Sequence, residues 1–385
     1  MLSVEMIVEL PAMDEPPAPE WDSLAVANGM PLMSPGWIIP WWEHLSPQGA
    51  EPRIVAVRDG SELIGLAPFY ADPCSHRGRI DYRLCGSWRS RLAPLARPGQ
   101  EWEVAAAVAR ALATTTPQPD VVALEALPLA SPWLAALRNG WPGAIRPSAR
   151  LYLTGQCPVV SLHEDSFDSW LAGRSAKFRS SMRRLRRRFE EAGGQWRMST
   201  PTTLPADIAT LLRLHFGRWE SRGKSGLAPL GERLPAMLED AGAMLCQDGR
   251  FRLWVAEVAG EPISADLYLA AGGEVLGFNG GWSESWKRLS PQLLATMRAI
   301  EDAFERGDRR LDLGLGDQSH KTRFADGNDP VGWAILMPAG RRLPLTAMRT
   351  APMLARHSAR AAAKRLLSPG QVDRLRGARA RYAPS

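Results

Sequence analysis

The order of strand-like and helix-like runs between residues 251 and 337 constrains the fold of this 385-residue chain more than any other feature. Three strand-like runs come first, then a helix opened by Ser290-Pro291, and then a strand, a loop or short helix, and a last strand. The ranges are, in chain order, 251–258, 262–271, 274–280, 290–307, 310–315, 317–324 and 332–337. A meander followed by a crossover helix and a parallel returning strand predicts an α/β domain with a mixed sheet.

Two helices are predicted before this core. In 175–192 the apolar residues Phe178, Met182, Leu185 and Phe189 form one stripe, and Gly193-Gly194 is a stop signal. The second helix runs from about Ala206 to Ser221, and its crowded apolar side includes His215, which indicates a core histidine.

The first half of the chain shows a shorter version of the same scheme. A capped, Trp-rich helix at 34–45 precedes a hairpin of two alternating runs, 54–58 and 62–70, joined by Asp59-Gly60-Ser61. A helix at 101–113 and a buried strand at 121–127 follow. We therefore expect two related α/β domains, 21–157 and 158–340, between an extension at 1–20 and a tail at 341–385.

Charge is divided unevenly between the body and the tail. Residues 341–385 contain ten Arg and one Lys against the single acid Asp373, which is +10, so the formal charge of +6 leaves −4 for the rest. In the tail Arg356, Arg360 and Lys364 recur every four residues beside a weakly apolar stripe. The tail could bind an anionic membrane surface or a signalling nucleotide such as a cyclic dinucleotide. The alternative is that it is a partly disordered, solvated end of the chain.

Other features bear on the compartment. The first twenty residues are acidic and lack the apolar core of a secretory signal, and no run is long and apolar enough to span a bilayer. The four cysteines lie far apart, which indicates neither a disulfide framework nor a zinc site. We expect a cytoplasmic protein that could also associate peripherally with the inner face of the membrane. We expect it to need no metal.

Several segments carry a likeness to a known family. They are KFRSSMRRLRRRFEEAGG (177–194), LHFGRWESRG (214–223), AEVAGEPISADLYLAAGG (256–273) and SPQLLATMRAIEDAFERGDRRLDLGLGDQSHKTRF (290–324). The chain resembles, over about residues 20–337, the FemAB-like group of tandem GNAT acetyltransferases that includes CelD and BcsL of cellulose and exopolysaccharide gene clusters. The resemblance implies acyl transfer to an amine. Acyl-CoA is the usual donor in the wider superfamily and aminoacyl-tRNA in the FemAB branch. His320 is a departure, because a Tyr commonly precedes the lysine in relatives.

Donor-binding candidates lie where the third strand ends and the crossover helix begins. Asn279 and Gly280 stand at the strand end, where glycine permits close approach of the backbone to a ligand. Arg288, Ser290 and Gln292 surround the helix start, where N–H groups and the helix dipole suit a pyrophosphate. An ordinary N-cap is the alternative, and the usual Q/R-x-x-G-x-G/A loop is missing.

A base must take the proton of the amine, and the candidates are Asp266, Asp312, Asp317 and His320. Asp266 interrupts an apolar strand, whose polar face it could simply occupy, and the other two carboxylates flank Leu313-Gly314-Leu315-Gly316, which could be a capping loop. Lys321 could hold a donor phosphate or an anionic acceptor, or be surface charge.

The arginines of 183–188 could bind nucleic acid, but a solvated helix face or a substrate-binding face is favoured, and we expect no DNA partner. The leading hypothesis is an acyl-CoA-dependent N-acyltransferase acting on an amino sugar of a cell-envelope or exopolysaccharide precursor. There are three alternatives: N-acylation of a lipid amine such as a sphingoid base, a regulatory module that reads a nucleotide, and FemAB-like aminoacyl transfer.

Overall fold

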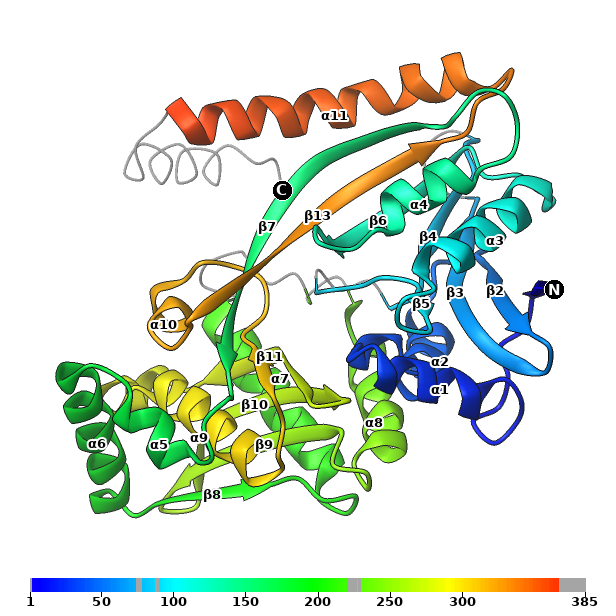
Figure 1. Ribbon diagram of the computed structural model, residues 1–385. Coiled ribbons are helices and arrows are strands. Elements are labelled where there is room, and N and C mark those ends of the chain that lie inside the picture. Colours follow the sequence, from blue (N-terminus) through cyan, green and yellow to red (C-terminus); the bar gives the residue numbers. More distant parts are fainter. Residues whose placement is uncertain (1, 74–77, 87–89, 220–226, 228–229, 367–385) are drawn as a thin grey trace.

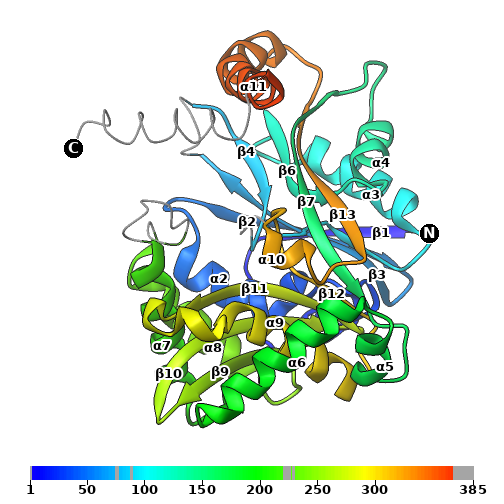
Figure 2. The ribbon, with the colours of Figure 1, turned by 90° about the vertical axis from the view of Figure 1, so that its left-hand side faces the viewer.

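The computed structural model describes residues 2–73, 78–86, 90–219, 227 and 230–366. Within them the strands form one mixed 13-stranded sheet with the order β1-β2-β3-β4-β6-β13-β7-β12-β11-β10-β9-β8, and β5 pairs with β3 (Figures 1 and 2). The strands are β1 (Leu2–Ile7), β2 (Glu51–Asp59), β3 (Glu62–Asp72), β4 (Asp81–Leu84), β5 (Leu95–Ala96), β6 (Val121–Pro128), β7 (Ser148–Ser161), β8 (Gly194–Met198), β9 (Phe251–Val258), β10 (Glu261–Ala271), β11 (Glu274–Trp282), β12 (Arg310–Asp312) and β13 (Gly327–Met337).

Helices cover both faces of this sheet. They are α1 (Ala18–Ala27), α2 (Pro35–Leu45), α3 (Glu101–Thr114), α4 (Trp133–Gly140), α5 (Phe167–Ala172), α6 (Ala176–Glu191), α7 (Leu204–Trp219), α8 (Arg233–Leu245), α9 (Pro291–Glu305), α10 (Ser319–Thr322) and α11 (Leu343–Leu366), with short 3₁₀ turns η1 (Pro31–Met33) and η4 (Glu284–Leu289). The predicted α/β class, with a mixed sheet flanked by helices, is confirmed. The expected end of the second helix at Ser221 and the tail residues 367–385 lie outside the described residues.

The predicted core of the second half is present in the predicted order. β9, β10 and β11 form an antiparallel meander, α9 crosses over, and β12 returns parallel to β11. The four apolar residues expected to form a stripe on α6 are all buried, and the Ser175 hydroxyl caps that helix by accepting from the Phe178 amide. Periodicity therefore predicted the buried face correctly.

The last strand differs from the prediction. β13 begins at Gly327, five residues earlier than expected, and pairs with β7 over residues 327–337 and with β6 from Val331 onward. β13 follows the second half in sequence but pairs with strands of the first half. The end of β7, in turn, pairs with β12 of the second half (Figure 1). The domain boundary at 157/158 stays a prediction, and it falls inside the continuous strand β7.

The two halves also share a core. One apolar cluster joins Trp21 and Trp37, from α1 and α2, to side chains of α7, α8 and β10 such as Leu211, Met237 and Leu267. A second cluster fills the space between the other face of β9–β12 and helices α5, α6 and α9. The β9–β12 meander is therefore packed on both faces, which holds its backbone rigidly.

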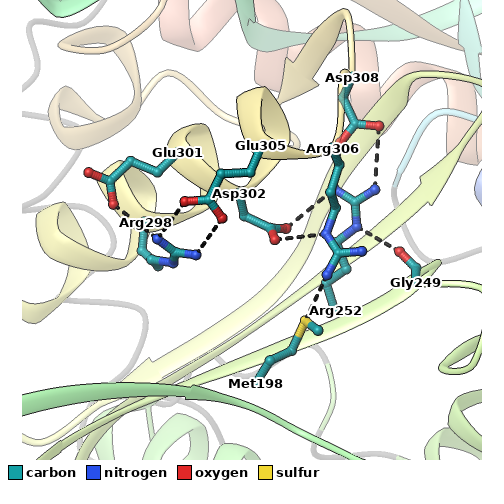
Figure 3. A network of polar contacts seen from close by, with 9 residues as sticks. All are labelled: Met198, Gly249, Arg252, Arg298, Glu301, Asp302, Glu305, Arg306 and Asp308. Atoms are coloured by element: carbon teal, nitrogen blue, oxygen red, sulfur yellow. Dashed lines mark hydrogen bonds and ion pairs between the residues drawn. The ribbon is translucent and has the colours of Figure 1, made fainter. Parts of the chain in front are cut away.

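A charged network fixes the end of α9 that is remote from its first turn (Figure 3). Buried Arg252 of β9 donates to Asp308 (2.5 Å) and to the Gly249 carbonyl (2.7 Å), and it lies 3.4 Å from Asp302. Asp302 also accepts from Arg306 at 2.8 Å. Because Arg252 and Asp302 are buried and paired, they hold the end of α9 against β9, and the first turn of α9 faces the site described next.

Candidate functional site

A cavity of about 350 Å³ lies where β11 and β12 part, between the meander, the first turns of α9, α10 and the end of α7. Its lining residues are His215, Leu227, Asp266, Leu267, Tyr268, Gly277, Phe278, Asn279, Gly280, Trp282, Gln292, Thr296, Leu313, Gln318, His320 and Lys321. Six of the ten predicted site residues are among them: Asp266, Asn279, Gly280, Gln292, His320 and Lys321. Its volume is in the range of small-molecule sites.

The backbone itself opens this cavity. β11 and β12 pair only from Glu274–Arg310 to Leu276–Asp312 and then diverge. At the divergence Gly277 and Gly314 approach so closely that a Cβ on Gly314, whose φ is +75°, would lie 2.8 Å from the Gly277 oxygen. The register also shifts there, leaving Phe278 as an extra residue in β11. A β-bulge interrupts the ladder and frees backbone groups to face a ligand.

Asp266 lies on the floor of the cavity, half-buried. It is opposite Gly280 in the β10–β11 ladder, and a Cβ on Gly280 would lie 2.0 Å from its Oδ1. The carboxylate therefore lies across the backbone of Gly280, in space that only a glycine leaves open. The side chain of Asn279 accepts from the Gly280 amide at 2.8 Å, which holds this strand end in place.

The next glycine, Gly281, allows α7 to pack closely on the opposite face of β11. A Cβ on Gly281 would lie 2.4 Å from the His215 amide nitrogen, so α7 packs directly on the strand here. His215, expected in a core, is buried but also lines the cavity, and its Nδ1 donates to the Gly280 carbonyl at 3.3 Å.

The facing wall comes from α9 and α10. Gln292 Nε2 donates to His320 Nε2 at 2.7 Å, so the ring proton of neutral His320 is on Nδ1. Lys321 Nζ donates to the carbonyls of Gly314 and Leu315 at 3.1 and 3.0 Å and so supports the loop after β12. Burial lowers the pKa of Lys321, and the nearby Asp312 carboxylate opposes that shift.

Asp312 and Asp317 do not line the cavity. Asp312 is fully buried beneath it, with Oδ1 accepting from the Gly314 amide at 2.7 Å. Burial raises the pKa of Asp312, and the positive charge of Arg91 from the first half opposes the rise. Asp317 is exposed on the loop before α10. Asp312 thus holds the turn after β12, which leaves Asp266 and His320 as the titratable side chains on the predicted list of bases that face the cavity.

The start of α9 differs from an ordinary N-cap. Ser290 has a left-handed backbone (φ +52°) and its side chain makes no capping hydrogen bond. Pro291 has no N–H, and the amides of Leu293 and Leu294 both donate to the Ser290 carbonyl. Arg288 is exposed, with its guanidinium 5.5 Å from the Trp286 ring. The helix start thus offers an anion fewer N–H groups than the sequence suggested.

The sequence reasoning missed several residues of this site, among them Tyr268 and Thr296. Tyr268 follows Asp266 by two on the same strand face, and strand alternation could have found it. Burial raises its pKa well above the usual value, and Asp266 adds to the rise. Thr296 lies one turn after Gln292 on α9, and its hydroxyl donates to the Gln292 carbonyl at 3.0 Å.

A separate group of possible metal ligands lies on the surface where α2 meets α8. Ligand atoms of Glu43, His44 and Asp240 are within 4.8 Å of one another, and His44 Nε2 is 2.6 Å from Asp240 Oδ2. The hydrogen bond explains the approach of the last two, and the expectation that the protein needs no metal stays a prediction.

Comparison with known proteins agrees with this geometry. The family described as the acetyltransferase (GNAT) domain matches residues 176–322, a segment that contains every residue lining the cavity. No curated protein sequence matches the chain.

Solved structures share the fold at low identity. FemX has a TM-score of 0.62 at 12% identity over 87% of this chain and 98% of its own. A Bacteroides thetaiotaomicron protein of unknown function scores 0.55 at 10% identity, over 87% and 100%. The C-terminal domain of a protein described as a lysylphosphatidylglycerol synthetase, from Agrobacterium fabrum, scores 0.53 at 11%, over 87% and 95%.

Residues 176–322 thus match the acetyltransferase (GNAT) domain, and that segment holds the whole lining of the cavity. Over 87% of its length the chain shares the fold of FemX, and the segment matched to the GNAT domain, residues 176–322, is one part of it. The narrower CelD and BcsL type stays a prediction.

Proposed function

We propose that this protein transfers an acyl group from a CoA thioester to a primary amine in the cavity between β11, α9 and α10. The observation that carries the proposal is the position of Asp266. This carboxylate lies on the cavity floor at the point where β11 and β12 part, and the cavity belongs entirely to the matched GNAT domain.

In the proposed reaction the amine nitrogen attacks the thioester carbonyl carbon, and Asp266 accepts one proton from the amine. The C–S bond then breaks, the amide forms, and the leaving thiolate receives a proton. The proton that Asp266 took from the amine passes through solvent to the thiolate, which restores the carboxylate. Neutral His320, held by Gln292, would donate its Nδ1–H as a hydrogen bond to the developing thiolate. Backbone amides released by the bulge at Phe278 would stabilise the oxyanion of the tetrahedral intermediate.

The donor arm would run along the open end of β11, beside Asn279 and Gly280. Its phosphates would meet Arg288, Ser290 and the backbone amide of Gln292 at the start of α9. Lys321 contributes a positive charge at the wall, although its hydrogen bonds to two carbonyls also make it a support of the loop after β12.

For the acceptor we propose an amino sugar of a cell-envelope or exopolysaccharide precursor. Amide and imidazole groups line the cavity, namely those of His215, Asn279, Gln292, Gln318 and His320. Such groups suit the many hydroxyls of a sugar, because each buried hydroxyl needs a hydrogen-bond partner.

The direct test measures release of free thiol from a panel of acyl-CoA donors with amino-sugar and lipid-amine acceptors. We expect turnover with an amino sugar, and a loss of at least about a hundredfold in kcat for Asp266→Asn, the usual size of a general-base contribution. Asp248→Asn is the matched control, because Asp248 is an exposed carboxylate after α8. Thiol release that is equal in the two variants would refute the role of Asp266.

A second candidate is aminoacyl transfer. Two observations favour it: the start of α9 has few N–H groups left for a pyrophosphate, and the fold is that of FemX and of a lysylphosphatidylglycerol synthetase domain. Native mass spectrometry of the purified protein separates the donors. A bound CoA species supports the first candidate. Absence of CoA turnover together with transfer from aminoacyl-tRNA would replace it with the second.

A further inference from the structure

Helix α11 lies lengthwise on the outer end of the β7–β13 ribbon, away from α6 and from α9, whose first turns line the cavity (Figures 1 and 2). Its inner side packs on the sheet through Leu343, Met353 and Leu354, which contact a cluster that includes Ile335 and Met337. The position of α11 is thus fixed by packing, and its opposite side faces solvent.

The outer side of α11 is an uninterrupted apolar face. Helical spacing places eight uncharged residues on it, and all eight are exposed: Pro344, Leu345, Met348, Ala351, Pro352, Ala355, Ala359 and Ala362. Leu345 is 43% exposed and Met348 is 65% exposed. We call these eight residues the outer face of α11. Contiguous exposed apolar surface of this kind often marks an interaction site.

Positive charges run beside this face. Arg349, Arg356 and Arg360 follow one flank of the helix at spacings of seven and four residues, and Arg341 and Arg342 lie exposed just before it. The whole segment 338–366 contains no Asp or Glu. An apolar helix face with a basic flank is the pattern of helices that lie in the plane of a membrane surface.

We propose that the outer face of α11 docks the protein on a membrane surface rich in anionic lipid, with the helix lying parallel to the bilayer. Leu345 and Met348 would enter the boundary between headgroups and acyl chains, while the flanking arginines meet lipid phosphates. No helix in the described part of the chain is long and apolar enough to cross a membrane. The proposal is independent of the proposed reaction.

Charge argues against the two other occupants of this face. A second copy of the chain would bring two basic, acid-free segments together, which is repulsive. Nucleic acid would bind the arginines but would leave the apolar residues exposed, since phosphates do not cover apolar side chains. Anionic lipid satisfies both features at once.

The test is sedimentation of the full chain with vesicles of phosphatidylcholine alone and with added phosphatidylglycerol. We expect binding only to the anionic vesicles, weakened by salt. Arg356→Ala with Arg360→Ala should weaken partitioning about thirtyfold, because each basic residue near an anionic surface contributes about fivefold. Leu345→Gln with Met348→Gln should also weaken it severalfold at unchanged charge.

Arg184→Ala with Arg188→Ala on α6 is the matched control, since both residues are exposed and the charge change is the same. It should bind like the wild type. The proposal is overturned if anionic vesicles do not bind the protein, if the α6 and α11 arginine pairs weaken binding equally, or if the glutamine variant binds fully. It is overturned equally if the wild type is a dimer in solution and the glutamine variant a monomer, because a second copy would then cover the face. Thermal unfolding confirms that each variant is folded.

Discussion

Gly280→Ala should abolish most of the activity while leaving the fold almost intact. The new Cβ would lie 2.0 Å from Asp266 Oδ1, and ordinary contact begins at 3.4 Å, so the carboxylate oxygen must move by about 1.4 Å. The obstacle is the end of a side chain that can rotate, so the cost in stability is small. A misplacement of about 1 Å in a reacting group can cost on the order of a hundredfold in rate.

Gly281→Ala is the contrasting variant, one residue further along β11. Its Cβ would meet the backbone of α7, 2.4 Å from the His215 nitrogen and 2.6 Å from the Leu214 carbonyl carbon, which cannot rotate away. Overpacking of this kind costs about 1–3 kcal/mol, so the midpoint of thermal unfolding should fall. Gly217→Ala on α7 has open space around its Cβ and should be neutral or slightly stabilising, which makes it the control.

The assay is acyl transfer at saturating donor for Gly280→Ala, Asp266→Asn and the double variant. If Gly280→Ala acts by displacing Asp266, the double variant turns over no more slowly than Asp266→Asn alone. Wild-type turnover in Gly280→Ala, or losses that multiply in the double variant, would refute the reasoning. A fall in the unfolding midpoint as large as that of Gly281→Ala would also contradict it.

Two further predictions concern stability. Burial raises the pKa of Asp312 in the folded protein above its ordinary value of 3.8. The free energy of unfolding of the wild type should therefore fall as the pH rises from 3.8 through the raised pKa of Asp312. Asp312→Asn should flatten this pH dependence in thermal unfolding, and a pH profile that is unchanged in the variant would contradict the assignment to Asp312. Trp37→Ala should lower the free energy of unfolding by about 3–5 kcal/mol, because Trp37 is fully buried with its ring 4.9 Å from Phe278. Trp102→Ala, at a half-exposed position on α3, should change the free energy of unfolding little. Equal losses in the two variants would show that burial of Trp37 does not account for its effect on stability.

Part of the site could be read from the sequence, and Asp266 shows where that reading stops. Alternation marked it as the polar member of an apolar strand, but the face it occupies became a cavity only when α9 and α10 were placed above it. Asp312 and Asp317 looked equivalent in the sequence, yet one is fully buried and the other exposed, because the chain turns sharply after β12. His215 belonged to an apolar helix face, as predicted, and lines the cavity as well.

The sequence by itself determined the elements whose signals are local: the stripe of α6, the β2–β3 hairpin, and the meander with its crossover helix α9. Local spacing suffices for these because hydrophobic periodicity and capping act within a few residues. Only the tertiary structure decided that β13 pairs with β6 and β7, that the two halves share one core, and that one side of α11 is covered while its apolar outer face is not. Those outcomes depend on contacts between residues far apart in the chain, whose free energy no short stretch of sequence contains.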